Sequence, residues 1–202
     1  MDPTQLKLFP DDVSRFPLVV GITSPAPRSG KTTMADVLVE EYGYTRLKFA
    51  KYLKQMVAMI VKAFGYTEAR AEFLIETRKD EVFEDLGCTL RHVMESLGTD
   101  WGRGLIRPDL WIILWKAEAD RLVREGKRVV ADDMRFMNEV QALKAIPGSQ
   151  TLMVIRPLAL VPPRHGATVE GLIAPEACDH QVVNDSDIST LEWWVRNWIE
   201  GR

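Results

Sequence analysis

Apolar residues along the chain fall into short continuous runs, separated by longer stretches in which they recur at helical spacing. The continuous runs cover 18–23, 45–49, 128–131, 151–155 and 181–184. Such runs are typical of strands buried on both faces of a parallel sheet. Apolar positions every three to four residues predict helices over 32–42, 138–145 and 190–199. The alternation of strands and helices predicts an α/β fold, with a parallel sheet covered by helices on both sides.

A long block between the second and third predicted strands has helical spacing and no convincing two-residue alternation. Its predicted helices cover 52–64, 67–79, 89–97 and 109–124. We therefore expect one domain over 18–202, with a helical block inserted at about 50–125. A polar segment over 1–17 precedes the first strand and predicts a tail. The many Pro and Gly residues of 156–175 predict a lid-like loop.

Composition narrows the classes of function. The 202 residues are 46% hydrophobic and 27% charged, which suits one globular domain, and the formal net charge of −3 does not favour binding to a long nucleic acid. The two cysteines, Cys88 and Cys178, are too few for a disulfide framework, so we expect them to be reduced and structural. We expect an unprocessed cytoplasmic protein, because the sequence shows no membrane-spanning run and no signal peptide.

The loop after the first strand carries a pattern suited to phosphate binding. A phosphate chain needs converging N–H donors, a positive helix end and a cation near its outer phosphates. In GxxxxGK[ST] loops the lysine reaches the β and γ phosphates and the next hydroxyl ligates Mg²⁺; here these are Lys31 and Thr32, while Pro25 stands at the first glycine position. The alternative is a loop that merely enters a helix. The residues predicted to hold the nucleotide here are Arg28, Ser29, Gly30, Lys31, Thr32 and Thr33.

Two acidic residues follow the predicted strand over 128–131. Parallel sheets bind ligands at the carboxyl ends of their strands, so Asp132 or Asp133 is a candidate for holding Mg²⁺ beside Thr32, and we assign this role to Asp132. The alternative is that both acids cap the next helix.

Arginines suit a transferring phosphoryl group, because their planar fork matches the charge on its equatorial oxygens. The candidates are Arg28, Arg91, Arg103, Arg135, Arg156 and Arg164, and each is alternatively a solvated surface residue. Arg135 follows the acidic strand end, and Arg156 and Arg164 flank the predicted lid. We interpret His165 and His180 as structural or polar contacts, because in-line transfer depends on positioning more than on a proton shuttle.

Several segments together resemble the bacteriophage deoxynucleoside monophosphate kinase family of P-loop kinases. The main ones are Arg28-Ser29-Gly30-Lys31, Phe49-Ala50 with Leu53-Lys54, Leu97-Gly98-Thr99-Asp100-Trp101-Gly102-Arg103 with Asp109 and Trp111, and Asp132-Asp133-Met134-Arg135-Phe136 with Asn138-Glu139. Weaker ones are His165 with Glu170, and Val183-Asn184-Asp185. Their order and spacing, from residue 18 to about 195, carry the resemblance.

The resemblance implies a three-layer P-loop NTPase fold and transfer of the γ-phosphoryl of ATP, with Mg²⁺, to a deoxynucleoside 5′-monophosphate. The inserted block would then bind the acceptor, and Arg156 and Arg164 of the lid would contact the nucleotide. Asp133 and Arg135 would lie between acceptor and donor and, with Lys31, act in catalysis. The implied acceptor-binding residues are Lys54, Arg91, Thr99, Trp101, Arg103, Asp133, Arg135 and Glu170. Trp101 would stack on a ring, or be a half-buried core residue.

The segment Gln5-Leu6-Lys7-Leu8-Phe9 resembles the short peptide by which bacterial replication proteins dock on the sliding clamp. Such peptides bind when they are extended and free, as a tail before a domain would be. The alternative is that Leu6, Leu8 and Phe9 fold back on the domain. A phage-encoded protein would work in the host cytoplasm, and a homodimer is compatible with the sequence.

Rival functions remain at this point. One is a P-loop kinase for another small acceptor, such as dephospho-coenzyme A or a phosphorylated isoprenoid precursor of the phosphomevalonate type. Another is a nucleotide-dependent switch or partitioning ATPase, although the chain has no Asn-Lys-x-Asp motif and has Pro25 and Ala26 where a second lysine is expected. A third is a clamp-bound adaptor with an inactive kinase fold, which the presence of Lys31 and Thr32 disfavours.

Overall fold

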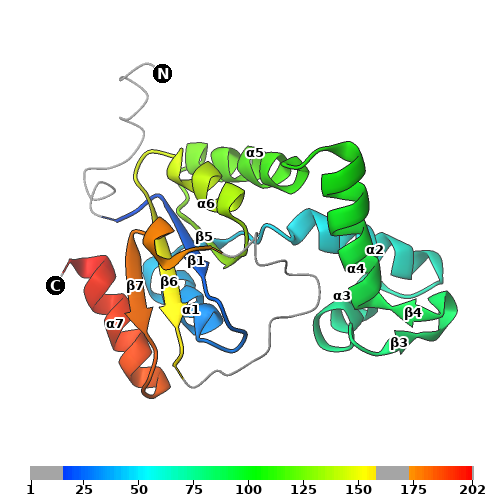
Figure 1. Ribbon diagram of the computed structural model, residues 1–202, viewed down its shortest axis with the longest axis horizontal. Helices are drawn as coiled ribbons and strands as arrows, with labels where there is room; N and C mark the ends of the chain where they lie inside the picture. Colours follow the sequence, from blue (N-terminus) through cyan, green and yellow to red (C-terminus); the bar gives the residue numbers. More distant parts are fainter. Residues whose placement is uncertain (1–15, 158–172, 202) are drawn as a thin grey trace. The chain divides into compact units, whose positions relative to one another are not determined.

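The computed structural model describes residues 16–157 and 173–201 of the chain (Figure 1). The chain divides into two compact units. The sheet unit consists of Met1–Lys48 and Lys116–Arg202, and the helical unit of Phe49–Trp115.

The sheet unit is built on five parallel strands. They are β1 (Val19–Thr23), β2 (Thr45–Arg46), β5 (Val129–Met134), β6 (Ser149–Ile155) and β7 (His180–Val183). Their order is β2-β5-β1-β6-β7, and every neighbouring pair is parallel. The predicted parallel sheet is confirmed. The largest differences from the predicted bounds are that β2 ends at Arg46 and that β5 continues to Met134.

Helices cover both faces of this sheet, which makes three layers (Figure 1). On one face, α1 (Lys31–Tyr42) and α7 (Ile188–Glu200) pack on the alternate strand residues that include Val20 and Ile22. On the other face lies α6 (Met137–Lys144), where a Cβ built on Gly21 would be 2.5 Å from Leu143 Cδ1. The predicted α/β fold with helices on both sides of the sheet is therefore correct.

The helical unit has its own apolar core. Its helices are α2 (Lys51–Ala63), α3 (Glu68–Thr77), α4 (Leu90–Glu95), the π-helix η4 (Ser96–Ile106) and the first part of α5 (Leu110–Arg124), which continues into the sheet unit. Buried side chains of α2, α3 and α4 meet in the core, among them Val61, Ile75 and Leu90.

The expectation that this block holds no strands is wrong. An antiparallel pair, β3 (Val82–Phe83) and β4 (Cys88–Thr89), flanks the short 3-10 helix η3 (Glu84–Leu86). Strands of two residues cannot show a two-residue alternation, so the sequence pattern does not reveal them. A second 3-10 helix, η6 (Pro175–Ala177), precedes β7 in the sheet unit.

Both cysteines are free thiols, as expected. Cys178 is buried, and burial raises the pKa of its thiol, which suits a structural role. Among the described helices, none has the length and apolar character needed to cross a membrane.

Candidate active site

The loop between β1 and α1 begins at a side-chain hydrogen bond between β1 and β5. Thr23 Oγ1 donates a 2.9 Å hydrogen bond to the carbonyl oxygen of Met134 at the end of β5. Within the loop, Ser24 Oγ lies 3.0 Å from the carbonyl oxygen of Ala26 and accepts from its N–H. The loop ends at Gly30, which caps the N-terminus of α1. The predicted strand, loop and helix are therefore present in the required order.

Two residues of the loop have left-handed backbone conformations, Arg28 with φ of 55° and Gly30 with φ of 107°. A non-glycine residue in this region costs about 1–2 kcal/mol. Pro25 does not have positive φ. This loop therefore has no left-handed backbone at the first position of the motif, because the proline ring fixes φ at a negative value.

Gly30 is closely packed by residues from outside the loop. A Cβ built on it would be 2.5 Å from Leu191 Cδ2 and 2.8 Å from Asn184 Nδ2, both closer than real carbon contacts allow. Gly30 N–H and its neighbours at the start of α1 lie at the positive end of that helix. The position therefore demands glycine both for its backbone conformation and for the space available.

The side chain of Lys31 folds back over the loop that would bind an anion. Its Nζ is 3.4 Å from the carbonyl oxygen of Ala26 and 3.5 Å from Ser29 Oγ. Thr32 is exposed and Thr33 is half-buried at the first turn of α1. The predicted loop residues thus converge on one place at the N-terminus of a 12-residue helix.

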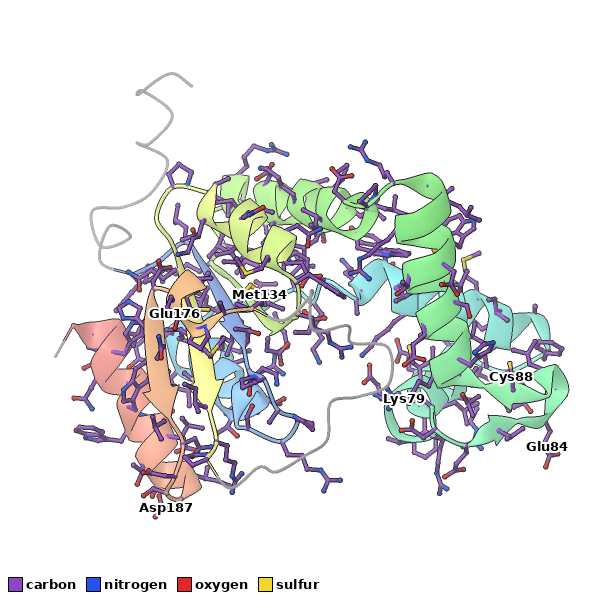
Figure 2. The ribbon with its side chains drawn as sticks, in the orientation of Figure 1. Lys79, Glu84, Cys88, Met134, Glu176 and Asp187 are labelled. Atoms are coloured by element: carbon purple, nitrogen blue, oxygen red, sulfur yellow. The ribbon has the colours of Figure 1, made fainter. Side chains whose placement is uncertain are left out.

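A cleft of about 640 Å³ opens over this loop. Its lining consists of Arg28, Ser29, Gly30, Lys31, Thr32, Thr33, Arg156, Asn184, Ser186, Asp187, Ile188, Ser189 and Leu191. The cleft lies at the carboxyl ends of β1, β6 and β7, where parallel sheets bind their ligands. Figure 2 labels Asp187 at the foot of α7, beside the end of β7.

Sequence reasoning placed Arg156 near the nucleotide and did not assign a role to Asn184. Arg156 Nη1 donates a 3.1 Å hydrogen bond to the carbonyl oxygen of Arg28. Asn184 is buried, and its Nδ2 donates a 2.7 Å hydrogen bond to the carbonyl oxygen of Ser29. The available signal was the position of Asn184 just after the last strand, since the same rule drew attention to the acidic pair that follows the predicted strand over 128–131.

Asp132 and Asp133 lie inside β5 rather than after it. Neither caps the next helix, because Phe136 is the N-cap residue of α6. The carboxylate that accepts a hydrogen bond from the N–H of Phe136 belongs to Glu139, in the first turn of the helix. The capping interpretation of the two acids is therefore wrong. The register between β1 and β5 shifts between Gly21 and Thr23, so β5 is irregular where the two acids occur.

Asp132 is a buried carboxylate with an unsatisfied oxygen. Its side chain is 2% exposed, and it lies 3.8 Å from Arg46 Nε and 4.0 Å from Lys48 Nζ. Asp132 Oδ1 has no hydrogen-bond partner within the described part of the chain. A buried carboxylate oxygen without a hydrogen bond, in the carboxyl-terminal half of a central strand, suits Mg²⁺, directly or through water. Three or more His, Cys, Asp or Glu side chains do not gather into a metal site in the described ranges.

Arg135 is exposed, but its backbone is held firmly. Oε2 of the buried Glu139 accepts hydrogen bonds from the N–H groups of Arg135, at 2.7 Å, and Phe136, at 3.1 Å. Glu139 thereby fixes the turn that connects β5 to α6 and sets the direction in which Arg135 leaves the strand.

The substitution Glu139→Ala is expected to lower the free energy of unfolding by about 2 kcal/mol, because two backbone N–H groups lose their acceptor near the core. Urea denaturation measures this. Glu139→Gln keeps one acceptor oxygen and is the matched control, for which we expect a smaller loss. Equal stability of wild type and the alanine variant would show that water replaces the carboxylate without loss.

Two predicted acceptor-binding cations of the helical unit are engaged with carboxylates. Lys54 Nζ lies 2.5 Å from Glu76 Oε1. Arg91 forms a two-pronged pair with Asp80, in which Nη2 lies 2.9 Å from Oδ2, and these hydrogen bonds raise the pKa of Arg91. An incoming phosphate would have to replace or share these partners.

The predicted residues Thr99, Trp101 and Arg103 lie together on the π-helix η4. Trp101 is 37% exposed and thus is not a core residue, whereas Trp111 is buried and donates its indole N–H to the carbonyl oxygen of Gly98 at 2.8 Å. π-Helical segments are rare and frequent at functional sites. Trp101 is thus available for ring stacking, which stays a prediction.

The remaining predicted residues divide into two groups. Gln5–Phe9, Arg164, His165 and Glu170 lie outside the described residues, as does most of the predicted lid over 156–175. His180 makes a polar contact as expected, because its Nε2 is 3.1 Å from Gln150 Oε1.

A comparison with known proteins shows a relative in sequence. A protein of Acanthamoeba polyphaga mimivirus, described as "Putative deoxynucleotide monophosphate kinase", is 29% identical over 175 residues, covering 79% of this chain and 85% of that protein. No family model matches the chain. The bacteriophage origin implied by the resemblance is not shown by this relative.

The solved structures that resemble this chain in backbone include the following two. Dephospho-CoA kinase from Campylobacter jejuni has a TM-score of 0.48 and 11% identity, covering 91% of this chain and 96% of that chain. TT1252 from Thermus thermophilus has a TM-score of 0.43 and 19% identity, covering 92% and 98%.

Proposed function

We propose that the chain is a kinase that transfers the γ-phosphoryl of ATP to a deoxynucleoside 5′-monophosphate in the presence of Mg²⁺. The observation that carries the proposal is the loop 24–30 with Lys31 folded over it, at the mouth of a cleft formed by three strand ends. The mimivirus relative supports the kinase class and the kind of acceptor.

The donor side of the reaction rests on the sheet unit. The N–H groups of Ser29, Gly30 and Lys31 at the start of α1 would bind the phosphate chain, and Lys31 Nζ would move from Ala26 to the γ-phosphate. Its charge would stabilise the negative charge that develops during transfer.

Thr32 and, directly or through water, Asp132 would hold Mg²⁺. When bound, this ion would neutralise part of the charge on the phosphates. The missing hydrogen bond at Oδ1 of Asp132 supports this assignment. Arg46 and Lys48, both about 4 Å away, keep the buried carboxylate compensated in the absence of a cation.

The helical unit carries most of the residues predicted to bind the acceptor. Lys54, Arg91, Thr99, Trp101 and Arg103 would bind the monophosphate, with Trp101 stacking on its base. Asp133 and Arg135 would orient the attacking phosphate oxygen and stabilise charge on the transferred group.

Release of ADP from ATP is the direct test. With Mg²⁺ present, we expect turnover with at least one deoxynucleoside monophosphate in a screen of all natural nucleoside and deoxynucleoside monophosphates. Dephospho-coenzyme A and phosphomevalonate serve as rival acceptors, and a reaction without acceptor reports plain ATPase activity.

Each outcome of this screen is informative. Turnover with a rival acceptor alone would replace the proposed substrate and keep the kinase class. ADP release that needs no acceptor would favour a switch or ATPase, and no release under any condition would overturn the kinase proposal. Docking of Gln5–Phe9 on a sliding clamp, dimer formation and the cytoplasmic location stay predictions.

A further inference from the structure

Two successive carbonyl groups of the loop 24–30, which we call the phosphate loop, accept hydrogen bonds from residues outside the loop. The carbonyl oxygen of Arg28 accepts from Arg156 Nη1 at 3.1 Å, and the carbonyl oxygen of Ser29 accepts from Asn184 Nδ2 at 2.7 Å. Arg156 follows β6 and Asn184 follows β7. The two donors therefore connect the loop to the ends of two neighbouring parallel strands.

These bonds set the direction of the loop's N–H groups. Both peptides are trans, so each N–H points away from the carbonyl oxygen of its own peptide. Holding the carbonyl oxygen of Ser29 at Asn184 turns the N–H of Gly30 to the opposite side. Holding that of Arg28 at Arg156 does the same for the N–H of Ser29.

The loop also needs an external restraint, because Arg28 has a left-handed backbone that a non-glycine residue rarely adopts. Such conformations persist where the surrounding structure over-determines them. Asn184 is the stronger of the two restraints, since it is buried, while Arg156 is exposed. Asn184 also packs on Gly30, where an added Cβ would be 2.8 Å from its Nδ2.

We propose that Asn184 is a positioning residue for phosphate binding, which holds the Ser29–Gly30 peptide so that its N–H faces the phosphate chain of the donor nucleotide. The inference rests on the proposed function only for the presence of a triphosphate donor. Asn184 itself acts through the loop and does not contact the reacting atoms.

The test compares two variants of Asn184 with a matched control at the other end of β7. Asn184→Ala removes the amide, and Asn184→Asp keeps its size but replaces the donor by an oxygen that repels the carbonyl of Ser29. In the control, Asp179→Ala removes a tether of similar kind, because Asp179 Oδ2 accepts from the N–H and the hydroxyl of Thr151 on β6, at 2.8 and 2.7 Å.

Calorimetric titration with ATP and with tripolyphosphate gives the readout, and thermal melting reports the fold. We expect Asn184→Ala to weaken binding of both ligands by a similar factor, about tenfold, because the loss lies in the phosphate cradle. Asn184→Asp should weaken both further. Asp179→Ala should lower the melting temperature and keep both affinities.

The inference would be overturned if the Asn184→Asp variant bound both ligands with wild-type affinity. This result decides the question even if Asn184→Ala does not fold. An equal loss of affinity in Asp179→Ala would overturn it too, because general loosening of β7 would then explain the effect. Wild-type protein that binds tripolyphosphate but phosphorylates no acceptor contradicts the proposed function alone. Wild-type protein that binds neither ligand contradicts both.

Discussion

Replacing Lys31 with methionine is expected to reduce kcat of phosphoryl transfer by roughly 10³-fold, the size of effect found when one preorganised charge at a transferring group is lost. Lys31 Nζ lies 3.4 Å from the carbonyl oxygen of Ala26 and 3.5 Å from Ser29 Oγ, long contacts that contribute little to the fold. Methionine keeps the apolar stem, so the free energy of unfolding should change little. Initial rates of ADP release and urea denaturation measure the two quantities.

The matched control for this change is Lys116→Met. Lys116 lies on α5 in the sheet unit and pairs with Asp120 one turn away, at 2.8 Å. Such partly exposed pairs contribute less than about 1 kcal/mol, so the control should keep both kcat and stability. Near-normal turnover in Lys31→Met would contradict the assignment of this loop to the γ-phosphoryl group, whatever the affinity for ATP.

The sheet was predictable because its strands are buried on both faces. β1 and the second half of β6, from Leu152 to Ile155, form apolar runs, and this pattern can be read from the sequence alone. The polar end of β5 was not predictable, because Asp132 and Asp133 remain in the strand through an irregular register with β1 that only the paired strands reveal. The pair β3 and β4 was not predicted either, because its strands have two residues each and are too short to show a sequence pattern.

Some contacts of the candidate site depend on neighbouring residues in the sequence, and others depend on residues far apart in the chain. The loop around Lys31 was predictable because a glycine, a lysine and a threonine in succession between a strand and a helix carry the signal within ten residues or so. The bond from Asn184 to Ser29 joins residues 155 positions apart, so no local pattern announces it. The pairing of Lys54 with Glu76 likewise depends on how α2 packs on α3.

Replacing Gly30 with alanine is expected to lower the free energy of unfolding by about 2–5 kcal/mol and to abolish measurable ATP binding. Two effects add: a left-handed backbone costs an alanine about 1–2 kcal/mol, and overpacking costs about 1–3 kcal/mol. The new Cβ would lie 2.5 Å from Leu191 Cδ2 and 2.8 Å from Asn184 Nδ2. Relief of this contact moves the loop or displaces Asn184, and either change disturbs the N–H groups that face the phosphates.

Gly43→Ala separates the two effects, because Gly43 also has a left-handed backbone, with φ of 69°, but a Cβ there would meet nothing within 4 Å. Gly43 ends α1 at the helix terminus remote from the phosphate loop, so this control should cost about 1 kcal/mol and keep ATP affinity. Urea denaturation and calorimetric titration compare the two variants. A stability loss in Gly30→Ala no larger than in Gly43→Ala would mean that Leu191 and Asn184 yield freely. Retained ATP affinity would then show that the close packing around Gly30 is not what shapes the phosphate cradle.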